Sequence, residues 1–216
     1  MRAKKIWEYL LDLMLPRPES VKSIEEMGPE EFRRATRVIR DATPDTLAVF
    51  DYKHPLIRQA IWELKYRGNR KITELLAKCV FEELVDELSS QKIIKNFDTP
   101  LLIPIPLSKK RLRERGFNQC ELVAEILGKL DNGNFFEVRT NLLIKIKDTE
   151  SQTKKNRGKR LENLKGCFVI TKPENITDRN VIVLDDVTTT GATFDEARRT
   201  LEASGARRVL FTAIAR

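Results

Sequence analysis

Two adjacent carboxylates and a run of hydroxyl residues stand together in the segment VIVLDDVTTTGATF, residues 181–194. Asp185 and Asp186 follow four apolar residues, so we expect them where a buried strand ends. The loop 188–193 offers hydroxyl donors and unhindered backbone N–H groups. A helix predicted to begin near Phe194 points its positive dipole end at the same place. This combination is suited to binding a phosphate group.

The two carboxylates repel a phosphate, so they cannot bind it themselves. They suit the hydroxyl groups of a sugar or, through water, a divalent metal ion. The segment therefore predicts a ligand that carries a ribose diol and a phosphate together. The loop residues expected at the phosphate are Thr188, Thr189, Thr190, Gly191, Ala192 and Thr193.

Three alternatives for this segment fit less well. A P-loop requires Gly-Lys-Ser/Thr, and the loop contains no lysine. A response-regulator receiver carries its paired aspartates near its start, whereas only 30 residues follow Asp186. A polar turn, with Thr193 capping the helix and both aspartates hydrated, would leave the agreement of the whole segment with one ligand unexplained.

A second predicted strand end carries a cluster of cations. Five Lys and Arg residues occupy the seven positions 109–115, directly after the apolar run 101–107. Arginine binds phosphates through paired hydrogen bonds, so we expect a pyrophosphate here. The two lysines are equally well explained as a solvated charged surface. The stronger candidates are Arg111, Arg115 and Gly116, with Arg115 expected at the start of the next helix.

The polar, basic stretch 147–166 separates two predicted strands and is 20 residues long. That length exceeds what a compact domain needs for a connection. The stretch is either a segment without fixed structure or a lid. A lid would close over an anionic substrate and exclude water from it.

Predicted strands alternate with predicted helices along the chain, and their apolar runs are nearly continuous. This pattern indicates an α/β fold with a mostly parallel sheet covered on both faces. Ligands in such folds bind at the carboxyl ends of the strands. The expected strands are 101–107, 141–147, 166–170, 181–186 and 208–215, and the expected helices are 55–69, 71–88, 117–130 and 194–205.

The first part of the chain differs in character, so we predict a helical appendage at 1–45 and a main domain at 46–216. A short apolar helix, for docking on the main domain or on a partner, precedes the break Pro16-Arg17-Pro18. A polar helix is expected around Glu30–Arg40, closed by Pro44.

The composition sets wider limits. A net charge of +8 favours anionic partners, either nucleic acid or phosphorylated small molecules. The three cysteines form no Cys-x-x-Cys pair, which argues against a disulfide framework or a zinc site. The first apolar stretch is too short for a membrane span and lacks a signal-peptide cleavage site, so a cytoplasmic protein is expected. Trp62 is expected to be a packing residue, and Phe117 either stacks on a base or anchors a helix.

The segment VIVLDDVTTTGAT resembles the phosphoribosyl pyrophosphate (PRPP) signature of type I phosphoribosyltransferases. Three further segments narrow the resemblance to the ComF/GntX group of phosphoribosyltransferase-like proteins. They are IPIPL…RLRERGFNQ, SQTKKNRGKRLENLKGCF and HPLIRQAIWELKYRGN, the last with Lys65, Tyr66 and Gly68 in a Lys-Tyr-x-Gly pattern. Together the motifs cover about residues 50–216.

The resemblance implies a type I phosphoribosyltransferase fold and a role for each motif. Asp185 and Asp186 would hold the ribose hydroxyls and stabilise a cationic sugar, and 188–193 would bind the 5′-phosphate. Arg111, Arg115 and Gly116 would bind pyrophosphate, with Mg²⁺ carried mainly by that ligand. The lid would contribute Gln152, Arg160 and Asn163. Many members of the group carry a zinc-binding cysteine module near the start, whose cysteines are missing here, so no zinc is expected.

Two functions follow from the resemblance, and both stay open at this point. One is transfer of a phosphoribosyl group between pyrophosphate and an unidentified nitrogenous base, with PRPP or a nucleoside monophosphate as ligand. The other is a non-catalytic role in DNA uptake, because members of the group are associated with competence alongside a helicase-like partner. In that role the chain would sense nucleotides or bind single-stranded DNA.

Overall fold

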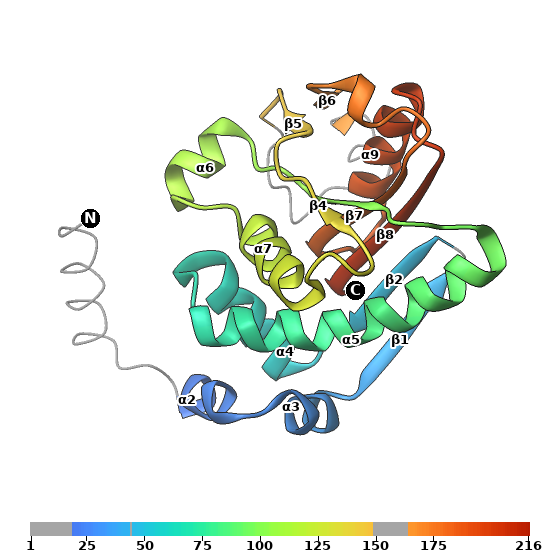
Figure 1. Ribbon diagram of the computed structural model, residues 1–216. Helices are drawn as coiled ribbons and strands as arrows, with labels where there is room; N and C mark the ends of the chain where they lie inside the picture. Colours follow the sequence, from blue (N-terminus) through green and yellow to red (C-terminus); the bar gives the residue numbers. More distant parts are fainter. Residues whose placement is uncertain (1–18, 44, 149–163) are drawn as a thin grey trace.

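The structure is a computed structural model that describes residues 19–43, 45–148 and 164–216 (Figure 1). The apolar segment before Pro16 lies outside these residues, and so do Pro44 and the lid candidates Gln152, Arg160 and Asn163. In the described part of the chain, no helix is both long enough and apolar enough to cross a membrane.

A six-stranded sheet forms the centre of the molecule, in the order β1-β2-β8-β7-β3-β4. All of its pairings are parallel except β1 with β2. This confirms the predicted α/β class with a mostly parallel sheet. The strands are β1 (Val38–Thr43), β2 (Thr46–Phe50), β3 (Leu101–Pro104), β4 (Glu137–Val138), β7 (Asn180–Val187) and β8 (Arg208–Ala215). A separate antiparallel pair is formed by β5 (Leu143–Lys145) and β6 (Phe168–Ile170).

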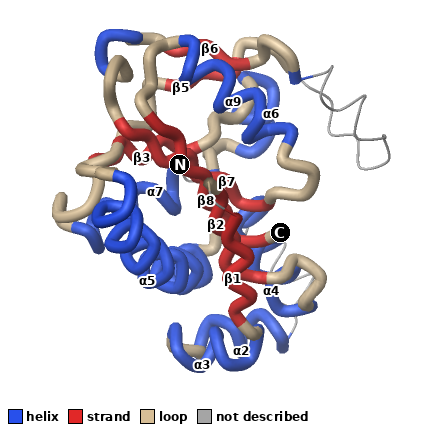
Figure 2. The backbone as a smooth tube through the Cα atoms, turned by 90° about the vertical axis from the view of Figure 1, so that its right-hand side faces the viewer, coloured by secondary structure: helices blue, strands red, loops and turns tan. Residues whose placement is uncertain are grey.

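Helices cover both faces of this sheet, as Figure 2 shows for α5 and α9. The alternation of side chains along a strand explains why both faces are apolar. On β7, Ile182 and Leu184 join the core beneath α5, whereas Val181 and Val183 join the core beneath α9. The helices are α2 (Glu19–Glu26), α3 (Pro29–Thr36), α4 (Pro55–Trp62), α5 (Arg70–Lys95), α6 (Lys109–Arg115), α7 (Gln119–Asp131) and α9 (Ala192–Ala203), with a π-helical turn η1 (Glu63–Arg67) and a 3₁₀ turn η2 (Pro173–Asn175).

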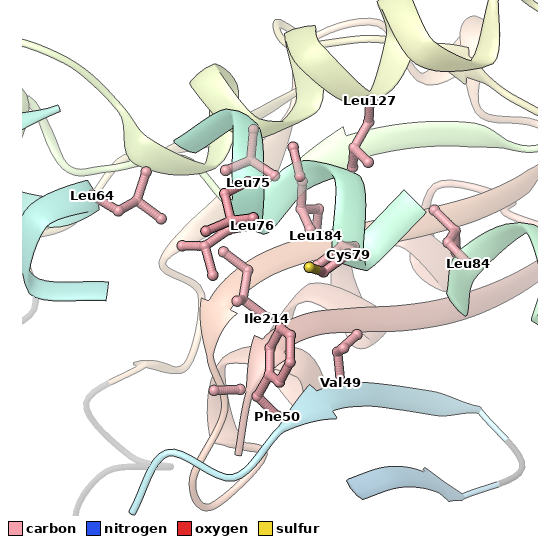
Figure 3. Packing of buried hydrophobic residues seen from close by; sticks show 14 of the residues in the cluster. Val49, Phe50, Leu64, Leu75, Leu76, Cys79, Leu84, Leu127, Leu184 and Ile214 are labelled. Carbon is pink, nitrogen blue, oxygen red and sulfur yellow. The ribbon is translucent and has the colours of Figure 1, made fainter. Parts of the chain in front are cut away.

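The long helix α5 packs a row of apolar side chains into the core on its side of the sheet. Leu75, Leu76 and Cys79 project from it towards Leu184 and Ile214 on the neighbouring strands (Figure 3). All five side chains are buried. Each Å² of apolar surface removed from water stabilises the folded state by roughly 25 cal/mol. This layer therefore helps to hold β7, the strand that carries the two aspartates.

The prediction of a polar helix around Glu30–Arg40 is wrong at its end. Helix α3 stops at Thr36 because Arg37 adopts a left-handed φ of 56°, and the chain then pairs with β2 as strand β1. Helix α2 and the short strands β2 and β4 were not expected from the sequence. Val21, Ile24 and Phe32 are fully buried in the same core as α5. The helices of the appendage therefore pack on α4 and α5, and its strand β1 is part of the sheet.

Candidate functional site

The carboxyl ends of β3 and β7 meet at a topological switch point. The chain leaves β3 towards β4 on one side and leaves β7 towards β8 on the other. Diverging connections of this kind open a crevice between the two strand ends. A cavity of about 210 Å³ lies there. It is lined by Lys65, Ile105, Pro106, Leu107, Ser108, Arg111, Arg115, Gln119, Lys145, Asp185, Asp186, Val187 and Thr193.

Asp186 is buried in this cavity and is held by two neighbours. Lys65 Nζ lies 2.7 Å from its Oδ1, and Gln119 Nε2 donates to its Oδ2. Arg115 in turn donates to Gln119 Oε1 at 2.6 Å. Burial lowers the pKa of Lys65, but the nearby acids, Asp186 first and then Asp185, together outweigh burial, so the pKa lies above its usual value. Asp186 is therefore an oriented carboxylate.

Asp185 has different surroundings. Its Oδ1 accepts the backbone N–H of Asp186 at 2.8 Å, and the Cys120 thiol donates to it at 3.6 Å. Burial and the adjacent charge of Asp186 raise the pKa of Asp185 to about 7. Burial and Asp185 likewise raise the pKa of Cys120, so its sulfur stays a thiol. Asp185 can thus gain or lose a proton near neutral pH.

Among the described residues, Cys120, Asp185 and Asp186 form a group that could hold a metal ion, with ligand atoms within 4.8 Å of one another. Lys65 already occupies one oxygen of Asp186. A cation bound directly would have to displace or tolerate that ammonium group. The Lys65 ammonium group therefore disfavours a divalent ion held directly by both carboxylates.

The threonine loop lies between two cavities. Helix α9 begins at Ala192, two positions earlier than expected, after Gly191 adopts a left-handed φ of 77°. Thr193 lines the cavity that holds the aspartates. A second cavity, of about 300 Å³, is lined by Thr46, Thr188, Thr189, Thr190, Gly191, Phe194, Asp195, Arg198, Phe211 and Arg216. Arg198 and Arg216 are cations beside the predicted phosphate loop that sequence reasoning missed.

The basic run forms the short helix α6. Ser108 caps it by accepting the backbone N–H of Arg111 at 3.4 Å, and Gly116 ends it with a φ of 81°. Arg115 and Gly116 therefore lie at the end of α6 and not at the start of α7, which corrects the prediction. Arg111 and Arg115 both line the cavity with the aspartates. Gly116 serves the backbone turn between the two helices.

The Lys-Tyr-x-Gly pattern lies on the turn η1, next to the aspartates. Its Gly68 has a φ of 59°, and a Cβ there would lie 3.1 Å from the ring of Phe117. Phe117 is therefore positioned against this turn, which favours its role as an anchor. The contact of Lys65 with Asp186 was not foreseen, although the pattern itself was noticed in the sequence.

A hydrogen-bond network joins η1 to helix α2. Asn69 caps α5 by accepting the N–H of Ile72 at 3.4 Å. Its side-chain amide donates to Glu25 at 2.7 Å and to the buried Glu63 at 3.4 Å. The backbone that carries Lys65 is thus held by groups from both the appendage and the main domain.

The two ends of the lid candidate are held side by side. Strands β5 and β6 pair, and Lys147 Nζ donates to the carbonyl of Lys165 at 3.1 Å. The backbone N–H of Gly166 donates to Glu196 on α9 at 2.6 Å. Lys145 on β5 lines the cavity with the aspartates. The stretch predicted as a lid therefore leaves from an element that borders the site.

Comparison with known proteins identifies the family. No protein-family model matches the chain. The competence protein ComFC of Bacillus subtilis is 31% identical over 210 residues, which cover 94% of this chain and 76% of the relative. The chain belongs to the ComF family. Among other relatives of this ComF protein, ComFC of Streptococcus pneumoniae is 28% identical over 75% of the chain and 64% of its own length. The DNA utilization protein YhgH of Escherichia coli K12 is 26% identical over 76% of the chain and 68% of its own.

The family assignment confirms the resemblance seen in the sequence. A solved structure that overlaps with the ComF chain is a mutant hypoxanthine phosphoribosyltransferase of Trypanosoma cruzi, complexed with the product IMP. The overlap covers 67% of this chain and 64% of the other, with a TM-score of 0.41 and 12% identity. The fold class of this ComF protein follows from its strand order and parallel pairings.

Proposed function

We propose that this protein binds PRPP and transfers its phosphoribosyl group between pyrophosphate and a nitrogenous base. The observation that carries the proposal is the Asp185–Asp186 pair at the switch point. It lies in one cavity with Arg111 and Arg115, and the threonine loop follows it directly. One sugar phosphate, with pyrophosphate on its anomeric carbon, matches all three features.

Each group of residues has a defined role in this scheme. The carboxylates accept hydrogen bonds from the ribose 2′ and 3′ hydroxyls, and Asp186 retains lone pairs for this beyond its contacts with Lys65 and Gln119. The loop 188–193 and the start of α9 bind the 5′-phosphate. Arg111 and Arg115 face the pyrophosphate, which carries Mg²⁺.

The reaction breaks the bond from C1′ to pyrophosphate, and both electrons leave with the pyrophosphate. A ring nitrogen of the base then donates its electron pair to C1′, and the N–H proton of the base is released to water. Positive charge builds on the sugar between these events, and an ionised Asp185 stabilises that charge. Asp185 needs no rearrangement to do so, because its Oδ1 already accepts the backbone N–H of Asp186.

Calorimetric titration of the full chain with PRPP and Mg²⁺ tests the proposal. We expect saturable binding by the wild type and by the control variant Asp178→Asn. Asp178 is an exposed acid just before β7, at the end of that strand opposite to Asp185. The control therefore removes one acidic group at a distance from the site. Release of pyrophosphate is then followed with a panel of purine and pyrimidine bases. Absence of PRPP binding by the wild type would overturn the proposal.

A second function has separate support. The relatives are named competence and DNA utilization proteins, and α6 carries exposed cations outside the cavity lining, namely Lys109, Lys110 and Arg113. We propose as the alternative an accessory protein that binds single-stranded DNA. This alternative is favoured if the chain binds PRPP but no base in the panel causes release of pyrophosphate. Its affinity for a short oligonucleotide should fall steeply between about 50 and about 200 mM salt.

Two arginines on α6 provide a matched test of the pyrophosphate site. Replacing Arg111 by alanine should weaken PRPP binding about tenfold or more, because a charge-assisted hydrogen bond contributes about 1.5–3 kcal/mol. Replacing Arg113, which is exposed and outside the cavity lining, should change the affinity less than about twofold. Calorimetry measures both. Equal losses in the two variants would mean that α6 acts only through its general charge.

PRPP affinity should depend on pH through Asp185. Its carboxylate accepts ribose hydroxyls best when ionised, and its pKa of about 7 leaves it mostly protonated at pH 6. Affinity should therefore rise about tenfold from pH 6 to pH 8, with a proton released on binding. Calorimetry in buffers of different ionisation enthalpy measures that proton. In Asp185→Asn the part of the pH dependence due to this group should vanish, and an unchanged profile would contradict the assignment.

A further inference from the structure

A third cavity borders the site and is larger than the other two. Its volume is about 610 Å³, within the range of small-molecule pockets. It lies between the start of α2, the chain after β2, and helix α4 with η1. Its lining includes Trp62, Tyr66, Tyr52, Gln59, Ser20 and Lys65.

Two large aromatic side chains of this cavity are exposed. Trp62 is 45% exposed and Tyr66 is 59% exposed, so the prediction that Trp62 is a packing residue is wrong. The two rings lie 5.5 Å apart at an angle of 44°. Arg67 lies over the Trp62 ring at 5.5 Å, and Arg115 lies over the Tyr66 ring at 5.3 Å. Exposed rings held by cations are surfaces on which another flat ring can stack.

This cavity and the cavity of the aspartates share a side chain. Lys65 lines both cavities and pairs with Asp186. Arg115 lies over Tyr66, lines the cavity of the aspartates and donates to Gln119. The two cavities are therefore neighbours that share Lys65.

The cavity also contains groups that can read the edge of a ring. Gln59 offers an amide, Tyr52 a phenol and Ser20 a hydroxyl, and each can donate and accept hydrogen bonds. An apolar stacking surface with a few polar side chains is the usual make-up of a pocket for a heterocycle. Ser20 comes from α2, so the appendage contributes directly to this cavity.

We infer that this cavity receives the acceptor base, a purine or pyrimidine that stacks on Trp62 and Tyr66 while the attached sugar lies on Asp185 and Asp186. The inference rests on the proposed function of the same site. It assigns the substrate class that the aspartates and the threonine loop leave undefined.

The test compares ligands with and without a base. The variant Trp7→Phe leaves Trp62 as the single tryptophan of the chain and is the background for every measurement. AMP, GMP, CMP and UMP are titrated against it, with ribose 5-phosphate as the ligand that lacks a base. We expect at least one monophosphate to bind more tightly than ribose 5-phosphate and to change the fluorescence of Trp62.

Variants of Tyr66 then identify the ring as the contact. Tyr66→Ala should weaken the preferred monophosphate about 5- to 150-fold, the range for loss of one stacking partner, without changing the affinity for ribose 5-phosphate. Tyr66→Phe keeps the ring and should stay within about threefold of the background protein. Tyr66 is exposed, so neither change should prevent folding.

The outcomes separate this inference from the proposed function. If neither PRPP nor ribose 5-phosphate binds, the proposed function fails. If ribose 5-phosphate binds and no base adds affinity, the inference about the third cavity fails alone. It also fails if Tyr66→Phe loses as much affinity as Tyr66→Ala. A short oligothymidylate that changes Trp62 fluorescence when no monophosphate does would assign the aromatic rings to a DNA strand and overturn the acceptor site.

Discussion

Replacing Asp185 by asparagine is expected to weaken PRPP binding about 10- to 100-fold. The variant would lose the charge-assisted hydrogen bonds between the carboxylate and the ribose, each of which contributes about 1.5–3 kcal/mol. Asparagine has nearly the same shape, so the cavity should keep its form. Calorimetry of wild type, Asp185→Asn and the matched control Asp178→Asn measures the effect. Equal affinities in all three proteins would exclude Asp185 from the ligand.

The same substitution should make the folded state more stable above pH 7. The pKa of Asp185 is about 7 in the folded chain against an ordinary value of 3.8, so the folded state binds the proton more tightly. The stability from this proton is fully present below pH 3.8 and is lost as the pH rises through about 7. An asparagine avoids that loss, which amounts to at most about 4 kcal/mol.

Urea unfolding at pH 5 and pH 8 measures this effect on the free energy of unfolding. The wild type should lose more stability over this interval than Asp185→Asn. A variant that gains stability while it loses PRPP affinity would show that the carboxylate needed to bind PRPP lowers the stability of the free protein. A variant that is less stable than the wild type at pH 8 would contradict the origin of the raised pKa.

The ion pair between Lys65 and Asp186 should show strong coupling. Asp186→Asn alone should cost on the order of 2–3 kcal/mol, below the value for a fully buried pair because the Lys65 side chain is 22% exposed. Lys65→Met alone should be similarly costly, since it leaves a buried carboxylate with one fewer partner. The double variant should cost at least about 1 kcal/mol less than the sum. Unfolding in urea measures all three.

An exposed pair serves as the control for this cycle. Arg70 and Glu74 are one helical turn apart, with side chains 88% and 42% exposed. Changes to that pair should show coupling of less than about 0.5 kcal/mol. The double variant at Lys65 and Asp186 should regain stability without regaining PRPP affinity, because the ribose still lacks the carboxylate of Asp186. Additive costs at Lys65 and Asp186 would mean that the two charges do not interact.

The parts of the site that could be predicted from the sequence are those whose residues lie in one short segment of the chain. Asp185, Asp186 and the threonine loop follow one strand, so their placement depends only on that strand and the helix after it. Lys65 and Gln119 could not be predicted as their partners. Gln119 lies 67 positions from Asp186, and Lys65 reaches the same carboxylate from another part of the chain. Only the packing of η1, α7 and β7 brings the three together.

The errors in the fold have similar causes. The segment 38–40 reads as the end of a polar helix, but its pairing with β2 as part of β1 decides its conformation instead. β2 is a five-residue strand whose apolar run is too short to separate from its surroundings. Trp62 lies among aliphatic residues at helical spacing. That spacing predicts the helix correctly, but it does not show which face of the helix borders a cavity.

The contact between Glu25 and Asn69 has a consequence for how the molecule can change over evolutionary time. The residues before the sheet look dispensable, because they carry none of the motif that binds the sugar phosphate. They nevertheless set the pose of the turn that presents Lys65 and Tyr66, and they supply Ser20 to the aromatic cavity. Under the proposed function, a lineage that remodels α2 would therefore alter which base is accepted before it alters the binding of the sugar. Specificity would drift while the aspartates stay unchanged.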